Sequence, residues 1–120
     1  MWEVEFTNDF EEWWDGLTEK EQEAVRSGVL LIKEFGPSLK FPFSTKVEQS
    51  RHGNMRELRT QQGGRPLRTF YAFDPSRTAI LLIGGNKTGD DRFYDSIVPK
   101  ADKIYDEYLK EIQEEKHENP

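Results

Sequence analysis

The chain has 120 residues, no cysteine and a formal net charge of −6 at pH 7. A chain of this length folds as one domain, and without cysteine it forms no disulfide, thiolate zinc site or cysteine nucleophile. It shows no leader pattern and no run of the ~20 apolar residues that span a bilayer, so we expect a soluble cytoplasmic domain over residues 1–120, frayed from about residue 114.

The first elements are a strand and a short helix. Residues 2–6 alternate between apolar and acidic side chains, which is the period of a half-buried strand. Asn8 or Asp9 is a suitable cap for the helix that follows, and Gly16 ends it.

A second, longer helix is indicated over residues 19–35. Thr18 and Glu21 have the spacing of a capping box, in which each side chain accepts from the other's backbone amide. Apolar residues then recur at three- and four-residue steps until Gly36 and Pro37 stop the helix. Residues 36–50 contain further proline and no clear period, so we expect a loop there.

The rest of the chain predicts three strands and a last helix. The strands are joined by short turns and form an antiparallel meander, over residues 55–60, 67–74 and 78–83. The third is apolar on both faces, which is typical of a central strand. An apolar stripe predicts the helix from Val98 to about Glu115, with Pro99 in its first turn.

This order of elements predicts an α+β fold. The sheet would have about four antiparallel strands, with two N-terminal helices on one face and a C-terminal helix after the last strand. With its helices gathered on one side, the sheet would leave its other face open.

Charge is divided unevenly along the chain. Residues 1–45 carry a net charge of −6, residues 46–100 carry +4, and residues 101–120 carry −4. The basic middle is densest where five arginines face the single acid Glu57: Arg51, Arg56, Arg59, Arg65 and Arg68. Such a surface either holds a phosphate backbone or consists of solvated cations paired with carboxylates. The period of two leaves open whether Arg59 and Arg68 share one face of the sheet.

The polar stretch GGNKTGDDRFYDS, residues 84–96, matches no metal or phosphate loop. Its glycines and Lys87 lack the spacing of a P-loop, and its oxygens do not fall at EF-hand positions. Three carboxylates, Asp90, Asp91 and Asp95, have the chemistry for magnesium, but acids are also favoured at a helix start. We therefore interpret them as helix-start residues and expect no metal or cofactor.

Four segments resemble the RelE/ParE/HigB superfamily of type II toxin–antitoxin toxins, in particular its HigB-like, phage-derived branch. They are HGNMRELRT (52–60), PLRTFYAFD (66–74), AILLIGGNKTGDD (79–91) and the helical AD-x-IYDEYL (101–109), in that order over nearly the whole chain. The resemblance implies the RelE-like fold and a toxin that cleaves messenger RNA on the ribosome without a metal. It also implies a helix-turn-helix antitoxin, bound in a hetero-oligomer that neutralises the toxin.

The resemblance also implies roles for particular residues, carried over by position. Arg68 would bind the scissile phosphate, with Arg59 or Arg56 adding charge. Lys87 or Arg92 would support the developing negative charge, and Tyr94 or His52 would be the acid–base group. Arg51 and Arg65 would join Arg56 in binding RNA.

One departure from the family pattern keeps two alternatives open. Where RelE-like toxins place lysines on the first meander strand, this chain has Met55 and Glu57, so a lysine base there is missing. The alternatives are a ParE-like toxin that inhibits DNA gyrase without cleaving nucleic acid, and a degenerate module that only binds an antitoxin.

Overall fold

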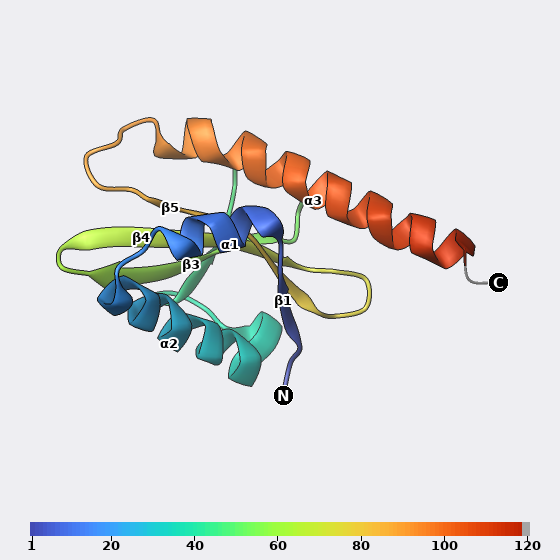
Figure 1. The fold of residues 1–120 in the computed structure, drawn as a ribbon, viewed down its shortest axis with the longest axis horizontal. Coiled ribbons are helices and arrows are strands. Elements are labelled where there is room, and N and C mark those ends of the chain that lie inside the picture. Colours follow the sequence, from blue (N-terminus) through green and yellow to red (C-terminus); the bar gives the residue numbers. More distant parts are fainter. Residues whose placement is uncertain (119–120) are drawn as a thin grey trace.

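The computed structural model describes residues 1–118. Five strands form one sheet in the order β1-β5-β4-β3-β2, in which β1 is parallel to β5 and all other neighbours are antiparallel. Their bounds are β1 Val4–Phe6, β2 Ser44–Lys46, β3 Met55–Gln62, β4 Arg65–Phe73 and β5 Ala79–Asn86. Helices α1 (Asn8–Asp15) and α2 (Glu19–Phe35) lie on one face, α3 (Phe93–Glu118) lies on the other, and the short 3-10 helix η1 (Gly36–Ser38) follows α2 (Figure 1).

The first two helices begin at hydroxyl caps. The Thr18 side chain accepts from the Glu21 backbone amide at 3.2 Å, and the Glu21 carboxylate accepts from the Thr18 amide at 2.9 Å, which confirms the predicted capping box. Helix α1 is capped by Thr7 instead of Asn8 or Asp9, since the Thr7 hydroxyl accepts from the Phe10 amide at 3.1 Å. Thr7 also donates to the Leu82 carbonyl at 2.7 Å, so this cap joins α1 to the sheet.

Two separate apolar cores lie on the two faces of the sheet. Leu58, Leu67 and Tyr71 point toward α1 and α2, where Val25 and Ile32 cover them. The residues that point the other way pack against an apolar stripe on α3: Met55, Phe70, Ala72, Ile80 and Leu82 from the strands, with Phe93, Ile97, Val98, Ala101 and Tyr105 from the helix. The expectation of an open second face was therefore wrong, because α3 covers that face beside β4 and β5.

The α+β class is confirmed, with differences in the individual elements. The sheet has five strands because the loop expected over residues 36–50 contains β2, which is too short to show a period. Strand β5 is interior, but β4 is the middle strand. Helix α3 begins at Phe93 and places Pro99 inside the helix; Phe93 and Ile97 are buried against the sheet, and this packing outweighs the amide that proline lacks.

Strands β3 and β4 are joined by the two-residue turn Gly63-Gly64, with φ of 61° and 76°. Two consecutive left-handed residues are the geometry of a tight hairpin, so the predicted turn is confirmed. Helix α3 extends to Glu118, and Asn119 and Pro120, the end of the predicted frayed tail, lie outside the described residues. Among the helices of residues 1–118, none combines the length and apolar character of a membrane span.

Candidate active site

Two arginines lie side by side on the face of the sheet that α3 partly covers. Arg59 of β3 and Arg68 of β4 are direct partners in the antiparallel register, so they share a face. This answers the question that the period of two left open. Arg68 is 7% exposed, and the Arg59 side chain is one third exposed. One cation is therefore held inside the protein and its neighbour reaches solvent.

A buried carboxylate lies next to both arginines. Glu57 is 5% exposed, and its Oε1 lies 3.9 Å from Arg68 Nε and 3.8 Å from Arg59 Nη1. The same oxygen accepts hydrogen bonds from the Tyr94 hydroxyl at 2.9 Å and from Thr45 Oγ1 at 3.1 Å. Strands β2, β3 and β4 and helix α3 thus each contribute a side chain to one polar cluster.

This cluster has unused hydrogen-bonding capacity. Four buried side-chain atoms of the described residues have no hydrogen-bond partner: Glu57 Oε2 and Arg68 Nε in this cluster, and the hydroxyls of Thr60 and Thr69 on the opposite face. The Arg68 guanidinium makes one bond, from Nη1 to the Leu67 carbonyl at 3.1 Å. A buried acceptor and a buried donor without partners are costly to keep, and such atoms are commonly found where a protein binds a ligand.

Tyr94 closes the cluster from the first turn of α3. Burial raises the pKa of its phenol, and the hydrogen bond to Glu57 and the charge of that carboxylate raise it further. The phenol is therefore fully protonated at neutral pH and can donate a proton. Lys87 Nζ lies 5.2 Å from the centre of the Tyr94 ring, which keeps a further cation beside the cluster.

A cleft of about 220 Å³ opens beside this cluster. Glu57 and Tyr94 line it together with the segment that follows β2, residues 46–49. Within the described residues, no group of three or more His, Asp or Glu side chains is arranged to hold a metal ion. The cleft itself offers the Glu57 and Glu48 carboxylates, the Tyr94 phenol and the Lys46 ammonium, and the Arg59 and Arg68 guanidinium groups lie behind it, beside Glu57.

Four of the predicted site residues make no contact with the Glu57 cluster. Arg56 is on the opposite face of the sheet, where it donates to Ser44 Oγ at 2.9 Å and to the Leu39 carbonyl at 3.1 Å. Arg65, the first residue of β4, reaches the first turn of α2, where its Nη1 lies 3.7 Å from Glu21 Oε2. His52 and Arg51 both contact Asp106, which follows Tyr94 by twelve residues on α3, or about 18 Å along the helix axis. Arg51 also lines a second cleft, of about 370 Å³, together with Tyr94, so of these residues it comes nearest to the site.

Two glycines near the end of β5, Gly84 and Gly85, have a packing role. A Cβ at Gly84 would lie 2.2 Å from the Trp13 ring, and one at Gly85 would lie 2.8 Å from Phe93. The two glycines therefore let α1 and α3 approach opposite faces of the same strand. Asp90 accepts from the Arg92 amide at 2.9 Å at the start of α3, in agreement with a helix-start role, and the Arg92 side chain is exposed.

Glu57 and Thr45 are cluster residues that the sequence interpretation did not include. Thr45 is opposite Glu57 in the register of β2 and β3, a relation that depends on a strand too short to recognise from its pattern. A signal for Glu57 was present, because it is the one acid among the arginines of residues 51–68. When several arginines gather on one surface, a carboxylate among them lowers their mutual repulsion, so a lone acid in such a segment is a candidate site residue.

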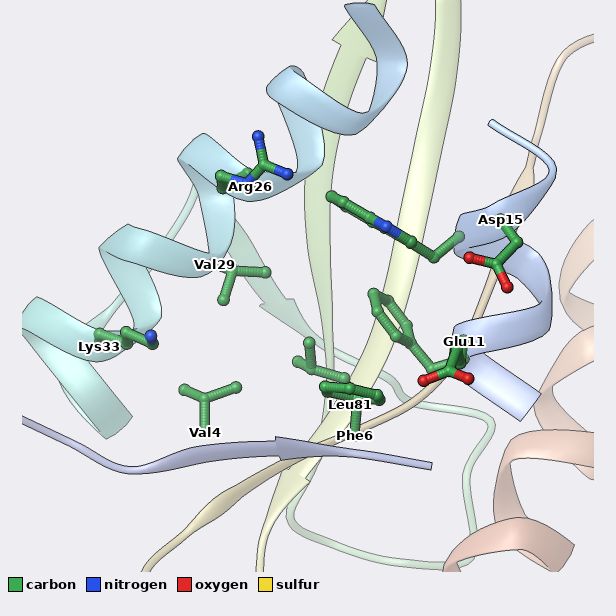
Figure 2. A pocket seen from close by; sticks show the side chains of 10 residues that line it. Val4, Phe6, Glu11, Asp15, Arg26, Val29, Lys33 and Leu81 are labelled. Carbon is green, nitrogen blue, oxygen red and sulfur yellow. The ribbon is translucent and has the colours of Figure 1, made fainter. Parts of the chain in front are cut away.

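A second surface feature lies on the α1/α2 face. Figure 2 shows a groove with α1 on one wall, α2 on the other and β1 along its edge. Its volume is about 430 Å³, and its lining is mainly apolar: Val4, Phe6, Phe10, Trp14, Val29 and Leu81. Acidic Glu11 and Asp15 stand on the α1 wall, and basic Arg26 and Lys33 stand on the α2 wall. The groove is thus an apolar channel between walls of opposite charge.

Comparisons with known proteins agree with this architecture. The family model described as "Phage derived protein Gp49-like (DUF891)" matches residues 12–106. The putative toxin HigB2 of Mycobacterium tuberculosis is 39% identical over 106 residues, which are 87% of this chain and 53% of HigB2, so the chain spans about half the length of that relative. The putative toxin HigB3 of the same organism is 39% identical over 82% of this chain and 86% of HigB3.

Solved structures show the same fold at low sequence identity. The isolated Escherichia coli RelE toxin superimposes with a TM-score of 0.58 at 10% identity, over 81% of this chain and 96% of that one. The RelE–RelB complex of Pyrococcus horikoshii gives 0.54 at 13% identity, over 73% and 97%. The chain therefore belongs to the phage-derived Gp49-like family, within the HigB-like branch of the RelE/ParE/HigB superfamily.

Proposed function

We propose that this protein is the toxin of a type II toxin–antitoxin pair and that it cleaves messenger RNA without a metal. The proposal is supported by the relatives, which are named as putative HigB toxins. The observation that carries it is the buried cluster of Glu57, Arg68 and Tyr94, in which an acceptor and a donor have no partner. Carboxylate, guanidinium and phenol are the groups that acid–base cleavage of a phosphodiester needs.

The reaction is attack of an RNA 2′-hydroxyl on the adjacent phosphorus. In our proposal Glu57 accepts the 2′-hydroxyl proton, and a new bond forms from O2′ to phosphorus. Arg68 and Arg59 neutralise the phosphorane oxygens, and Lys87 adds positive charge nearby. The bond from phosphorus to O5′ then breaks, and Tyr94 donates its proton to O5′. The products are a 2′,3′-cyclic phosphate and a 5′-hydroxyl.

In our proposal the free protein holds this site closed. Arg68 is 7% exposed, and the Tyr94 hydroxyl donates to Glu57, whose carboxylate lies 3.9 Å from Arg68 Nε. A phosphate would then reach Arg68 once Tyr94 turns aside, which also frees its hydroxyl from Glu57. We propose that binding of messenger RNA in the ribosomal decoding site supplies this change. Such a requirement would keep the isolated toxin from cleaving RNA indiscriminately in the cytoplasm.

The partner that neutralises the protein is, in this proposal, a helix-turn-helix antitoxin. We place one of its helices in the groove between α1 and α2, because an amphipathic helix fills an apolar channel of this kind. The opposite charges of the walls favour a helix whose basic flank faces Glu11 and Asp15 and whose acidic flank faces Arg26 and Lys33.

The enzymatic proposal is tested by inducing wild type, Arg68→Ala and Arg65→Ala in cells. Growth is followed, and transcripts are mapped by primer extension. Wild type is expected to arrest growth with codon-linked cuts, and Arg68→Ala to lower cleavage by about 100-fold or more. Arg65→Ala is the matched control, since Arg65 is an exposed arginine of the same strand that pairs with Glu21. Arrest without transcript cleavage would refute the nuclease and favour a gyrase poison, and a harmless wild type would favour the degenerate module.

The antitoxin site is tested separately by two exposed apolar residues. Phe6 is 58% exposed and lines the groove, whereas Leu30 of α2 is 56% exposed and is not part of its lining. Phe6→Glu is expected to weaken co-purification with the helix-turn-helix protein encoded beside the toxin, and Leu30→Glu to leave it unchanged. If the two variants co-purify with the antitoxin to the same extent, the antitoxin does not bind in this groove.

A further inference from the structure

Two exposed phenylalanines lie in the loop between η1 and β2. Phe41 is 71% exposed and Phe43 is 47% exposed. Scattered apolar residues on a surface need no explanation, but these two both contact the same arginine. The Arg59 guanidinium carbon lies 5.4 Å from the centre of the Phe41 ring, and the Arg59 amide donates to the Phe43 carbonyl at 2.8 Å.

The loop is joined directly to the candidate active site. Ser44 is paired with Leu58, so Phe43, one residue before it, lies opposite Arg59. Arg59 in turn is paired with Arg68. The three residues therefore form one row across adjacent strands, and Phe43 is two strand spacings, or about 10 Å, from Arg68.

The surroundings of these rings are basic. The loop and β2 read KFPFSTK, residues 40–46, with two lysines, two phenylalanines and no acid. Lys40 and Lys46 are both exposed. Exposed aromatic rings between cations are the combination that binds single-stranded nucleic acid, because bases stack on the rings and phosphates meet the positive charges.

We propose that Phe41, backed by Arg59 and flanked by Phe43, is a stacking platform for a nucleobase of single-stranded RNA next to the scissile phosphate. This inference rests on the proposed ribonuclease function and specifies how its substrate is held. Arg59 covers one face of the Phe41 ring, and the exposed face receives the base. Since every base has a π face, the platform contributes affinity and positioning with little sequence preference.

The platform is tested with a short RNA in which 2′-O-methyl groups prevent cleavage. Its affinity is measured at low salt for wild type, Phe41→Ala, Phe41→Trp and Phe35→Ala. Phe41→Ala is expected to bind about fivefold or more weakly and Phe41→Trp as well as wild type, because a stacked base is lost in the first and kept in the second. Phe35→Ala is the matched control, since Phe35 is 46% exposed but lies at the end of α2.

A second arm replaces one base at a time by an abasic sugar. At one position of the RNA, the abasic change should weaken binding to wild type by about fivefold and leave binding to Phe41→Ala unchanged, because the two changes remove the same contact. If the abasic change and Phe41→Ala each weaken binding and their effects multiply at every position of the RNA, no single base stacks on Phe41 and the platform is wrong. Thermal unfolding of each variant confirms that the exposed substitution leaves the fold intact.

The outcomes separate this inference from the proposed function. If wild type cleaves transcripts and Phe41→Ala binds the RNA equally well, the platform is wrong and the nuclease stands. If wild type cleaves nothing but its RNA binding depends on Phe41 and on one base, the nuclease is wrong and the platform stands. If Phe41→Ala loses only the antitoxin, the loop is a protein-binding surface and the inference fails.

Discussion

The two faces of the sheet use the same strands for different purposes. On the α1/α2 face, side chains from β3 and β4 such as Leu58 and Tyr71 are sealed by two helices, which leave an apolar groove between them. On the α3 face, a single helix packs beside β4 and β5, and the neighbouring positions hold Glu57, Arg59 and Arg68. Alternation along a strand thus lets one sheet present an apolar surface on one side and a charged site on the other.

The contrast also concerns which buried polar atoms lack a hydrogen-bond partner on each face. On the α1/α2 face they are two neutral hydroxyls, Thr60 Oγ1 and Thr69 Oγ1, which share that face with Leu58. On the α3 face they belong to an ion pair, Glu57 Oε2 and Arg68 Nε, next to a cleft. Unused polar capacity costs stability, and proteins commonly accept that cost at functional sites. Substitutions on the two faces should therefore differ in what they disturb.

The largest effect on stability is expected from Glu57→Ala. It leaves the Arg68 guanidinium buried without its carboxylate, and removal of one partner of a buried ion pair costs about 3 to 4 kcal/mol. For a domain of this size that corresponds to a Tm about 12 °C lower. Calorimetry of the variant beside wild type measures this change.

The matched control for that variant is Arg59→Ala. Arg59 pairs with the same carboxylate at a similar distance, but its side chain is one third exposed. Its removal should cost only about 0.5 kcal/mol, because solvent screens the pair. If Arg59→Ala lowers the Tm as much as Glu57→Ala, the cost does not come from leaving Arg68 buried without its carboxylate, and the closed state of the site is wrong.

The next effect compares the two faces at adjacent glycines. In Gly84→Ala the new Cβ meets the Trp13 ring at 2.2 Å, whereas in Gly85→Ala it meets the ends of the Phe93 and Ile97 side chains at 2.8 and 2.9 Å. We expect losses of about 3 kcal/mol and about 1 kcal/mol in the free energy of unfolding, because the Trp13 overlap is deeper and the ends of the Phe93 and Ile97 side chains can shift. Urea titration measures both, and a larger loss for Gly85→Ala would reverse the predicted difference between the faces.

Much of the fold could be predicted from local signals. The capping box at Thr18 and the Gly63-Gly64 turn specify α2 and the hairpin, because each depends on residues close together in the chain. The start of α3 could not be predicted, since Pro99 is locally a helix-start signal and the packing of Phe93 on the sheet, which begins the helix earlier, is a tertiary contact.

The candidate site was predicted less completely, because it too depends on contacts between segments that are far apart in the sequence. Arg68 and Tyr94 were suggested by resemblance, but their meeting with Glu57 depends on the register of β3 with β4 and on where α3 crosses the sheet. A period of two assigns side chains to faces only after one face is identified as core. Arg56 and Arg59 are separated by an odd number of positions, so they had to lie on opposite faces, and only the structure shows which one joins Arg68.

The last effect concerns a buried carboxylate that ties the β4–β5 turn to α3. Asp74 accepts from the Ser76 and Thr78 amides at 2.9 and 3.0 Å and from the Tyr108 hydroxyl at 2.9 Å. Burial by itself raises the pKa of this carboxyl, but the hydrogen bonds from Ser76, Thr78 and Tyr108 outweigh it and hold the pKa below its usual value. Ionised Asp74 therefore stabilises the folded state.

The sign of that shift gives a pH-dependent prediction for Asp74→Asn. Because the folded pKa is depressed, the stabilisation is fully present well above the unfolded pKa of about 3.9 and is lost as the pH falls from there through the folded value. The variant should be less stable than wild type by about 1 kcal/mol at pH 7, and the difference should shrink progressively below about pH 4. Urea titrations of both proteins from pH 7 to pH 2 measure it. A difference that stays constant over this range would mean that the charge of Asp74 does not stabilise the fold. The link between this turn and α3 would then rest on the packing of the two tyrosines and on the hydrogen bond from the Tyr105 hydroxyl to the Phe73 carbonyl.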